Sequence, residues 1–139
     1  LLLFTLPIAI AQTISIDVLT PLEREQDLFT ASVIHRIMQT QEEKVTEGMM
    51  TPFESRCIAT NTVDLLGTPN ADRFTQITER SLLGIEPSLQ DERFIAEISE
   101  RYLIYLQLIA NQCTIEQERL NHREEMEQSS TEESPSLPN

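Results

Sequence analysis

Apolar residues recur at helical spacing in four segments of the chain, whereas apolar and polar residues alternate only over residues 13–18, and weakly there. The helical segments are residues 20–47, 51–66, 68–83 and a longest one that begins after Ser88. This pattern predicts an all-α protein.

Short sequence signals mark where these helices begin and end. Thr20-Pro21-Leu22-Glu23 and Thr51-Pro52-Phe53-Glu54 both have the form of a capping box, in which the Thr hydroxyl accepts a hydrogen bond from an early backbone N–H. Gly48, Gly67 and Gly84 each follow a helical segment, and glycine is the residue that most often ends a helix. We therefore expect short, rigid joints.

The longest helix is expected to form the spine of a bundle. Its apolar stripe advances in steps of three and four residues, through Ile95, Ile98, Tyr102, Tyr105 and Ile109. The second and third helices are separated by so few residues that we treat them as one rod broken at Gly67-Thr68-Pro69. The prediction is an antiparallel bundle of three rods over residues 20–123: a long helix, a broken helix and a long helix.

The two cysteines, Cys57 and Cys113, test this topology. If the chain folds back between Gly84 and Pro87, Cys57 falls opposite residue 114, one position from Cys113. In an up-down-up-down bundle of four helices the two cysteines would instead differ in height by roughly 30 Å. A disulfide needs Cα atoms within about 7 Å of each other, so a Cys57–Cys113 bond favours three rods. Two buried free thiols are the alternative.

The two ends of the chain differ in composition from the bundle. Residues 1–11 read LLLFTLPIAIA, with small residues at alternate positions near the end, which is typical of the apolar part and cleavage site of a signal peptide. We expect a leader cut short at 1–11 and an extended lead-in at 12–19. Residues 124–139 are rich in Glu, Ser and Pro and are expected to be a disordered acidic tail.

The leader and the disulfide together predict a secreted or periplasmic protein. Two alternatives stay open for residues 1–11: a buried first strand or helix, and an uncleaved membrane anchor. Contact with a membrane is expected only in the second case.

Charge and composition exclude several classes of function. Asp and Glu number 23 against 10 Lys and Arg, giving a net charge of -13, which argues against nucleic acid as a partner. The two cysteines and two histidines lack the spacing of a zinc site, and no nucleophile motif or phosphate-binding loop occurs. We therefore expect no catalytic site, no metal and no cofactor.

These observations favour a non-enzymatic, exported interaction module that offers an acidic surface to a basic protein. The candidate contact is the apolar joint that contains Met49, Met50 and Phe53, because methionine-rich surfaces adapt to partners; the alternative is that this joint is tucked beneath the bundle. The main alternative is a carrier of a small hydrophobic ligand, whose pocket would be lined by Phe74, Ile98, Tyr102 and Tyr105. Two further alternatives are a membrane-anchored accessory subunit and an enzyme whose site is completed by a partner chain.

Overall fold

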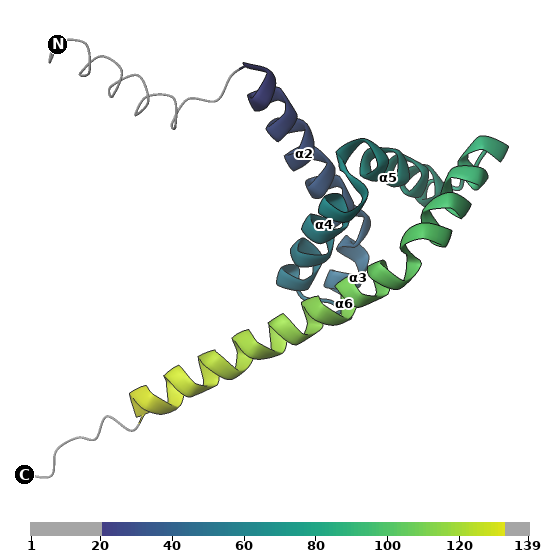
Figure 1. The fold of residues 1–139 in the computed structure, drawn as a ribbon. Helices are drawn as coiled ribbons and strands as arrows, with labels where there is room; N and C mark the ends of the chain where they lie inside the picture. Colours follow the sequence, from purple (N-terminus) through teal and green to yellow (C-terminus); the bar gives the residue numbers. More distant parts are fainter. Residues whose placement is uncertain (1–20, 133–139) are drawn as a thin grey trace, which may run out of the picture. The chain divides into compact units, whose positions relative to one another are not determined.

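The computed structural model describes residues 21–132, which form five helices and no strand (Figure 1). In chain order these are α2 (Pro21–Thr40), α3 (Glu42–Thr46), α4 (Pro52–Leu66), α5 (Thr68–Leu82) and α6 (Leu89–Glu132). The all-α prediction is confirmed for this part of the chain. The predicted leader and lead-in lie outside the described residues.

The chain divides into two compact units, residues 1–32 and residues 33–139. Of the first unit, the structure describes only the early turns of α2, where Leu22, Leu28 and Phe29 are exposed. The second unit contains the end of α2, the four later helices and the core.

The core of the second unit draws on every long helix within it. Its buried residues are Val33, Ile37, Ala59, Val63, Leu66, Ala71, Ile77, Phe94 and Ile98. Two of these are alanines with no exposed surface, and a residue this small lets helices approach closely.

The predicted helix signals are confirmed where the structure describes them. Thr51 and Glu54 form the capping box reciprocally: each donates its backbone N–H to the other's side-chain oxygen, both at 3.1 Å. All three glycines have φ between 77° and 80°, a left-handed conformation that side chains other than glycine rarely adopt. The box predicted at Thr20 involves a residue outside the described range.

α4 and α6 lie antiparallel in nearly the predicted register. Thr51 bonds to Gln117 across the two helices, and six residues later Cys57 is joined to Cys113. The disulfide prediction is thus confirmed, with a Cα–Cα distance of 5.7 Å. Cys57 pairs one position away from the residue 114 that the fold-back predicts.

The straight middle rod is wrong, because α5 turns away from the direction of α4 at Gly67 (Figure 1). Gly67 adopts φ 80° and ψ 148°, which redirects the chain between two helices that share this one residue as a cap. α5 contacts the start of α6, where Arg80 pairs with Asp91 at 3.2 Å and the Arg73 guanidinium lies 4.3 Å from the centre of the Phe94 ring. α4 runs antiparallel to α6, and α5 continues from α4 with a bend in place of a straight rod.

The first predicted helix, residues 20–47, is also broken in the structure, at Gln41 between α2 and α3. The Gln41 backbone N–H donates to Met38 O, three residues back rather than four, which tightens the end of α2. The Gln41 side-chain oxygen accepts a bond from the Ser55 hydroxyl at 2.8 Å. A contact with α4 therefore stabilises a break that helical periodicity does not reveal.

α6 continues to Glu132, so the prediction that disorder begins at residue 124 is wrong for residues 124–132. Glu, Gln and Met are good helix formers, and residues 124–128 consist only of these types. They extend a helix that already exists, so no new nucleus is needed. The rest of the predicted tail, residues 133–139, lies outside the described residues.

Candidate binding surface

The apolar joint between α3 and α4 is exposed at its two ends. Met49 is 75% exposed and Phe53 is 40% exposed, whereas Met50 is half-buried. The joint is fixed on both sides: the Met49 N–H donates to Lys44 O at 2.9 Å, and Thr51 begins the capping box of α4. The structure thus leaves two large apolar side chains in solvent, Met49 on the turn and Phe53 in the first turn of α4.

A groove of about 280 Å³ adjoins this joint, because Pro52 lines it. Met38 and Val45 supply the rest of its apolar lining, and Glu42 is one of the polar groups beside them. The groove therefore places a carboxylate next to an apolar floor.

A second hollow, of about 610 Å³, lies beside α3 and also includes Glu42. It adds Glu43 and Glu47 on the polar side and the 64%-exposed Leu82 on the apolar side. Across residues 42–47 three carboxylates stand against Lys44 alone. We call the groove, the second hollow and the joint together the α3 surface.

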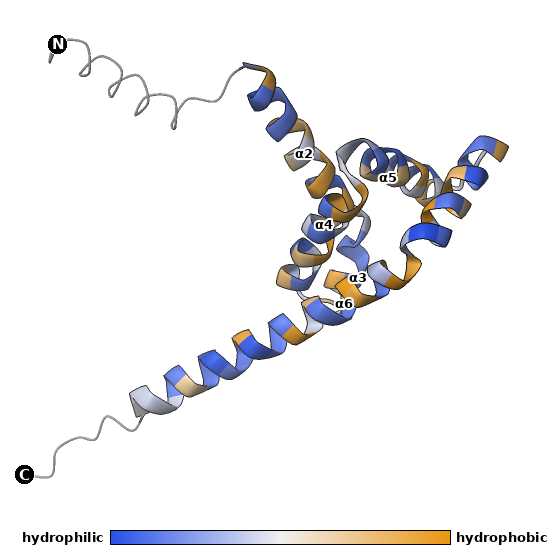
Figure 2. Cartoon of the chain, viewed as in Figure 1, coloured by the Kyte–Doolittle hydropathy of each residue, from blue (hydrophilic) through white to orange (hydrophobic). Residues whose placement is uncertain are grey.

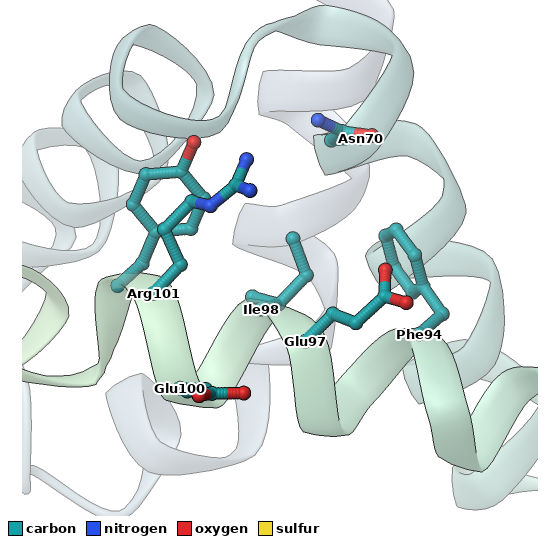
Figure 3. Close-up of a pocket in the computed structure, with 7 residues that line it drawn as sticks. Asn70, Phe94, Glu97, Ile98, Glu100 and Arg101 are labelled. Atoms are coloured by element: carbon teal, nitrogen blue, oxygen red, sulfur yellow. The ribbon is translucent and has the colours of Figure 1, made fainter.

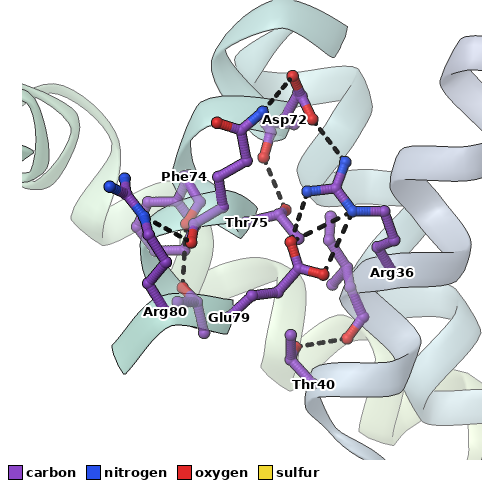
Figure 4. A network of polar contacts seen from close by, with 11 residues as sticks. Arg36, Thr40, Asp72, Phe74, Thr75, Glu79 and Arg80 are labelled. Atoms are coloured by element: carbon purple, nitrogen blue, oxygen red, sulfur yellow. Dashed lines mark hydrogen bonds and ion pairs between the residues drawn. The ribbon is translucent and has the colours of Figure 1, made fainter. Parts of the chain in front are cut away.

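The end of α2, which borders the groove, is held to α5 by an ionic network. Arg36 bonds to Asp72 at 2.6 Å and to Glu79 through both its Nε and one terminal nitrogen (Figure 4). The hydrogen bonds to Glu79 and then to Asp72 raise the pKa of Arg36 despite partial burial. His35 and Met38, one and two residues from Arg36 on α2, both line the groove.

The start of α6 carries a second ionic arrangement, built on Asp91. The Ser88 N–H donates to the Asp91 carboxylate at 3.2 Å, and the Asp91 N–H donates back to the Ser88 hydroxyl at 3.1 Å. Burial favours the neutral carboxyl, but the bonds from Ser88 and the charges of Arg80 and Arg73 outweigh it and lower the pKa of Asp91. This second capping box fixes the joint between α5 and α6.

The four residues of the predicted ligand pocket do not line one pocket, although Phe74, Ile98 and Tyr102 all belong to or pack against the same core. Ile98 and Tyr102 line an open hollow of about 520 Å³ whose other residues include Glu97, Glu100 and Arg101 (Figure 3). Phe74 lines a different hollow, of about 190 Å³.

Tyr105 is 57% exposed, so its predicted place in the apolar stripe of α6 is wrong. Leu106, which was not part of that stripe, is half-buried instead and lines the same hollow as Phe74. The cause is the bend at Gly67: α5 no longer follows α4 along α6, so the side of α6 that carries Tyr105 is left uncovered there.

Residues 21–132 contain no group of three or more His, Cys, Asp or Glu side chains that could hold a metal ion. None of the helices in that range is both long enough and apolar enough to cross a membrane. Comparison of the chain with protein-family models, curated proteins and solved structures finds no match in any of the three.

The sequence pattern identified the joint but missed the groove beside it. Met38 and Val45 belong to two helices that the periodicity had merged into one, so nothing indicated that they line a shared recess. The charge pattern of residues 42–47 was the available signal, since carboxylates are dense there and sit next to the methionines.

Proposed function

We propose that this protein is an exported, non-enzymatic module that binds a basic segment of another protein through the α3 surface. The observation that carries the proposal is the combination, at one place, of an apolar groove, two exposed apolar side chains and the carboxylates of α3. Carboxylates alone would be an ordinary solvated surface. An apolar recess beside them adds the favourable free energy of burying apolar surface, which exposed charges do not provide.

The expected partner segment is amphipathic and carries Lys or Arg. Its apolar side chains would enter the groove lined by Met38, Val45 and Pro52, and its cations would face Glu42, Glu43 and Glu47. Exposed charges of this kind raise the association rate and confer salt dependence more than they raise affinity. The Cys57–Cys113 disulfide supports an oxidising compartment as the place of action.

The carrier hypothesis has less support. The hollow that contains Ile98 and Tyr102 is open and is lined by three charged side chains, whereas a site for a hydrophobic ligand is expected to be enclosed and mostly apolar.

The proposal is tested by affinity capture from the extracellular or periplasmic fraction of the source cells. The pure protein serves as bait, at about 0.05 M and about 0.5 M salt. The diagnostic variant replaces Glu42, Glu43 and Glu47 with Gln. The matched control replaces Glu86, Glu92 and Glu97, at the joint before α6 and in its first turns, which removes the same charge from another exposed region.

We expect a protein captured at low salt to be lost at high salt, and its binding to the diagnostic variant to fall about tenfold, at roughly 0.5 kcal/mol for each rim charge. Equal loss with both variants would contradict the α3 surface as the site. Recovery of a lipid or pigment alone would replace the proposal with the carrier.

A further inference from the structure

The middle of α6 carries an exposed apolar belt that the core does not use. Residues 102–115 include no charged side chain, although charged residues are frequent on both sides of them (Figure 2). Five large apolar residues in this stretch are exposed: Leu103, Ile104, Tyr105, Leu108 and Ile115. Small soluble domains rarely leave so many apolar side chains together in water without a partner.

Much of this belt lies on one face, turned away from α4. Cys113 marks the side that faces α4, since it is fully buried and bonded to Cys57. At roughly 100° per residue, Ile104, Leu108 and Ile115 point to the opposite side, and exposed Met126 falls on the same line, with the polar side chain of His122 between Ile115 and Met126. We call these four residues the outer stripe of α6.

Charges of opposite sign border the outer stripe. The same helical geometry places Glu100, Glu118 and Glu125 along one edge and Arg101, Arg119 and Arg123 along the other. All six of these residues are exposed. Arg119 also forms an ion pair with Glu116, which lies on the same side of the helix but farther from the outer stripe.

This arrangement selects the partner. A partner of a single charge sign would be repelled at one edge or the other. Two identical helices that run antiparallel would bring like edges together, Glu against Glu and Arg against Arg. Two that run parallel bring the Glu edge of each against the Arg edge of the other, so only the parallel pair is complementary along both edges.

We propose that the outer stripe of α6 binds a second copy of this chain, forming a parallel, two-fold symmetric helix pair. Ile104, Leu108, Ile115 and Met126 each then pack against the same residue of the other copy. Asn111 lies on this face too, and a pair of Asn side chains in such a seam fixes the register of a parallel pair. The α3 surface takes no part in this contact, so the two proposals stand or fall separately.

The contact is expected to be weak and concentration-dependent. The stretch from Ile104 to Met126 is about 33 Å long and offers one narrow seam, which is less than a standard protein interface. Each copy also carries a net charge of -13, so the subunits repel each other at long range.

Sedimentation equilibrium of the full chain over a range of concentrations tests the association. We expect a monomer–dimer equilibrium, with the dissociation constant raised at least tenfold by Leu108→Glu. Leu83→Glu is the matched control, because Leu83 is 78% exposed on the joint between α5 and α6, and it should leave the dissociation constant unchanged. Circular dichroism establishes that both variants fold.

The orientation is measured with a nitroxide label at Ser129→Cys and electron–electron distance spectroscopy. Labels in a parallel pair lie side by side, whereas an antiparallel pair with Ile104 opposite Ile115 separates them by roughly 60 Å. A chain that stays monomeric, a dimer that survives Leu108→Glu, or the long label distance would each overturn the proposal.

Discussion

Loss of the Cys57–Cys113 disulfide should remove a large part of the stability of this protein. The bond links residues 56 positions apart, so the reduced unfolded chain regains the freedom of a long loop. In the chain-entropy account this corresponds to about 4 kcal/mol at 25 °C. Folded domains are stable by only about 5–15 kcal/mol in total, so the reduced protein should be close to unfolding.

The measurement compares oxidised and reduced protein in guanidinium chloride, followed by circular dichroism. With a slope of about 3 kcal/mol per molar denaturant, the midpoint should fall by roughly 1.3 M on reduction. The Cys57→Ala/Cys113→Ala variant should lose about 1 kcal/mol more, because Cys113 is fully buried and its sulfur leaves a small cavity.

Reduction of the alanine variant itself is the control and should change nothing. The reasoning is refuted if the midpoint of the native sequence moves by less than about 0.3 M on reduction, since the cross-link would then not restrict the unfolded chain.

Two further predictions concern the ionic contacts. Arg36→Met should lower the free energy of unfolding by about 1 kcal/mol, a value reduced for solvent screening because Glu79 is 38% exposed. Arg36→Lys should lose less stability than Arg36→Met. In chemical denaturation, the stability difference between Arg36→Met and the native sequence should shrink in about 1 M salt. The pKa of Asp91 is lowered by folding, so its stabilisation is present above its ordinary pKa of roughly 3.9 and is lost as pH falls through the lower folded value. Asp91→Asn should therefore flatten the dependence of stability on pH below about 4, and an unchanged slope would contradict this account of the capping box.

Local chemistry along the chain determined the helices and their joints. The Thr51–Glu54 capping box needs only residues three apart, and Gly67 and Gly84 end helices because they alone tolerate positive φ without strain. The Cys57–Cys113 pairing was predicted from the fold-back of one straight rod and is confirmed, but α5 bends away at Gly67, so the packing of α4 on α6 and not that register alone brings the two cysteines together.

The tertiary structure decided what local chemistry leaves open, namely the angles between helices and the faces they cover. The break at Gln41 depends on a bond from Ser55, and the exposure of Tyr105 depends on the bend between α4 and α5. Short-range preferences predict neither the break nor this exposure. The periodicity of a single helix shows which of its faces is apolar, but it does not show which neighbouring helix covers that face. For the same reason the groove beside α3 and the outer stripe of α6 became visible only once the helices were placed around one core.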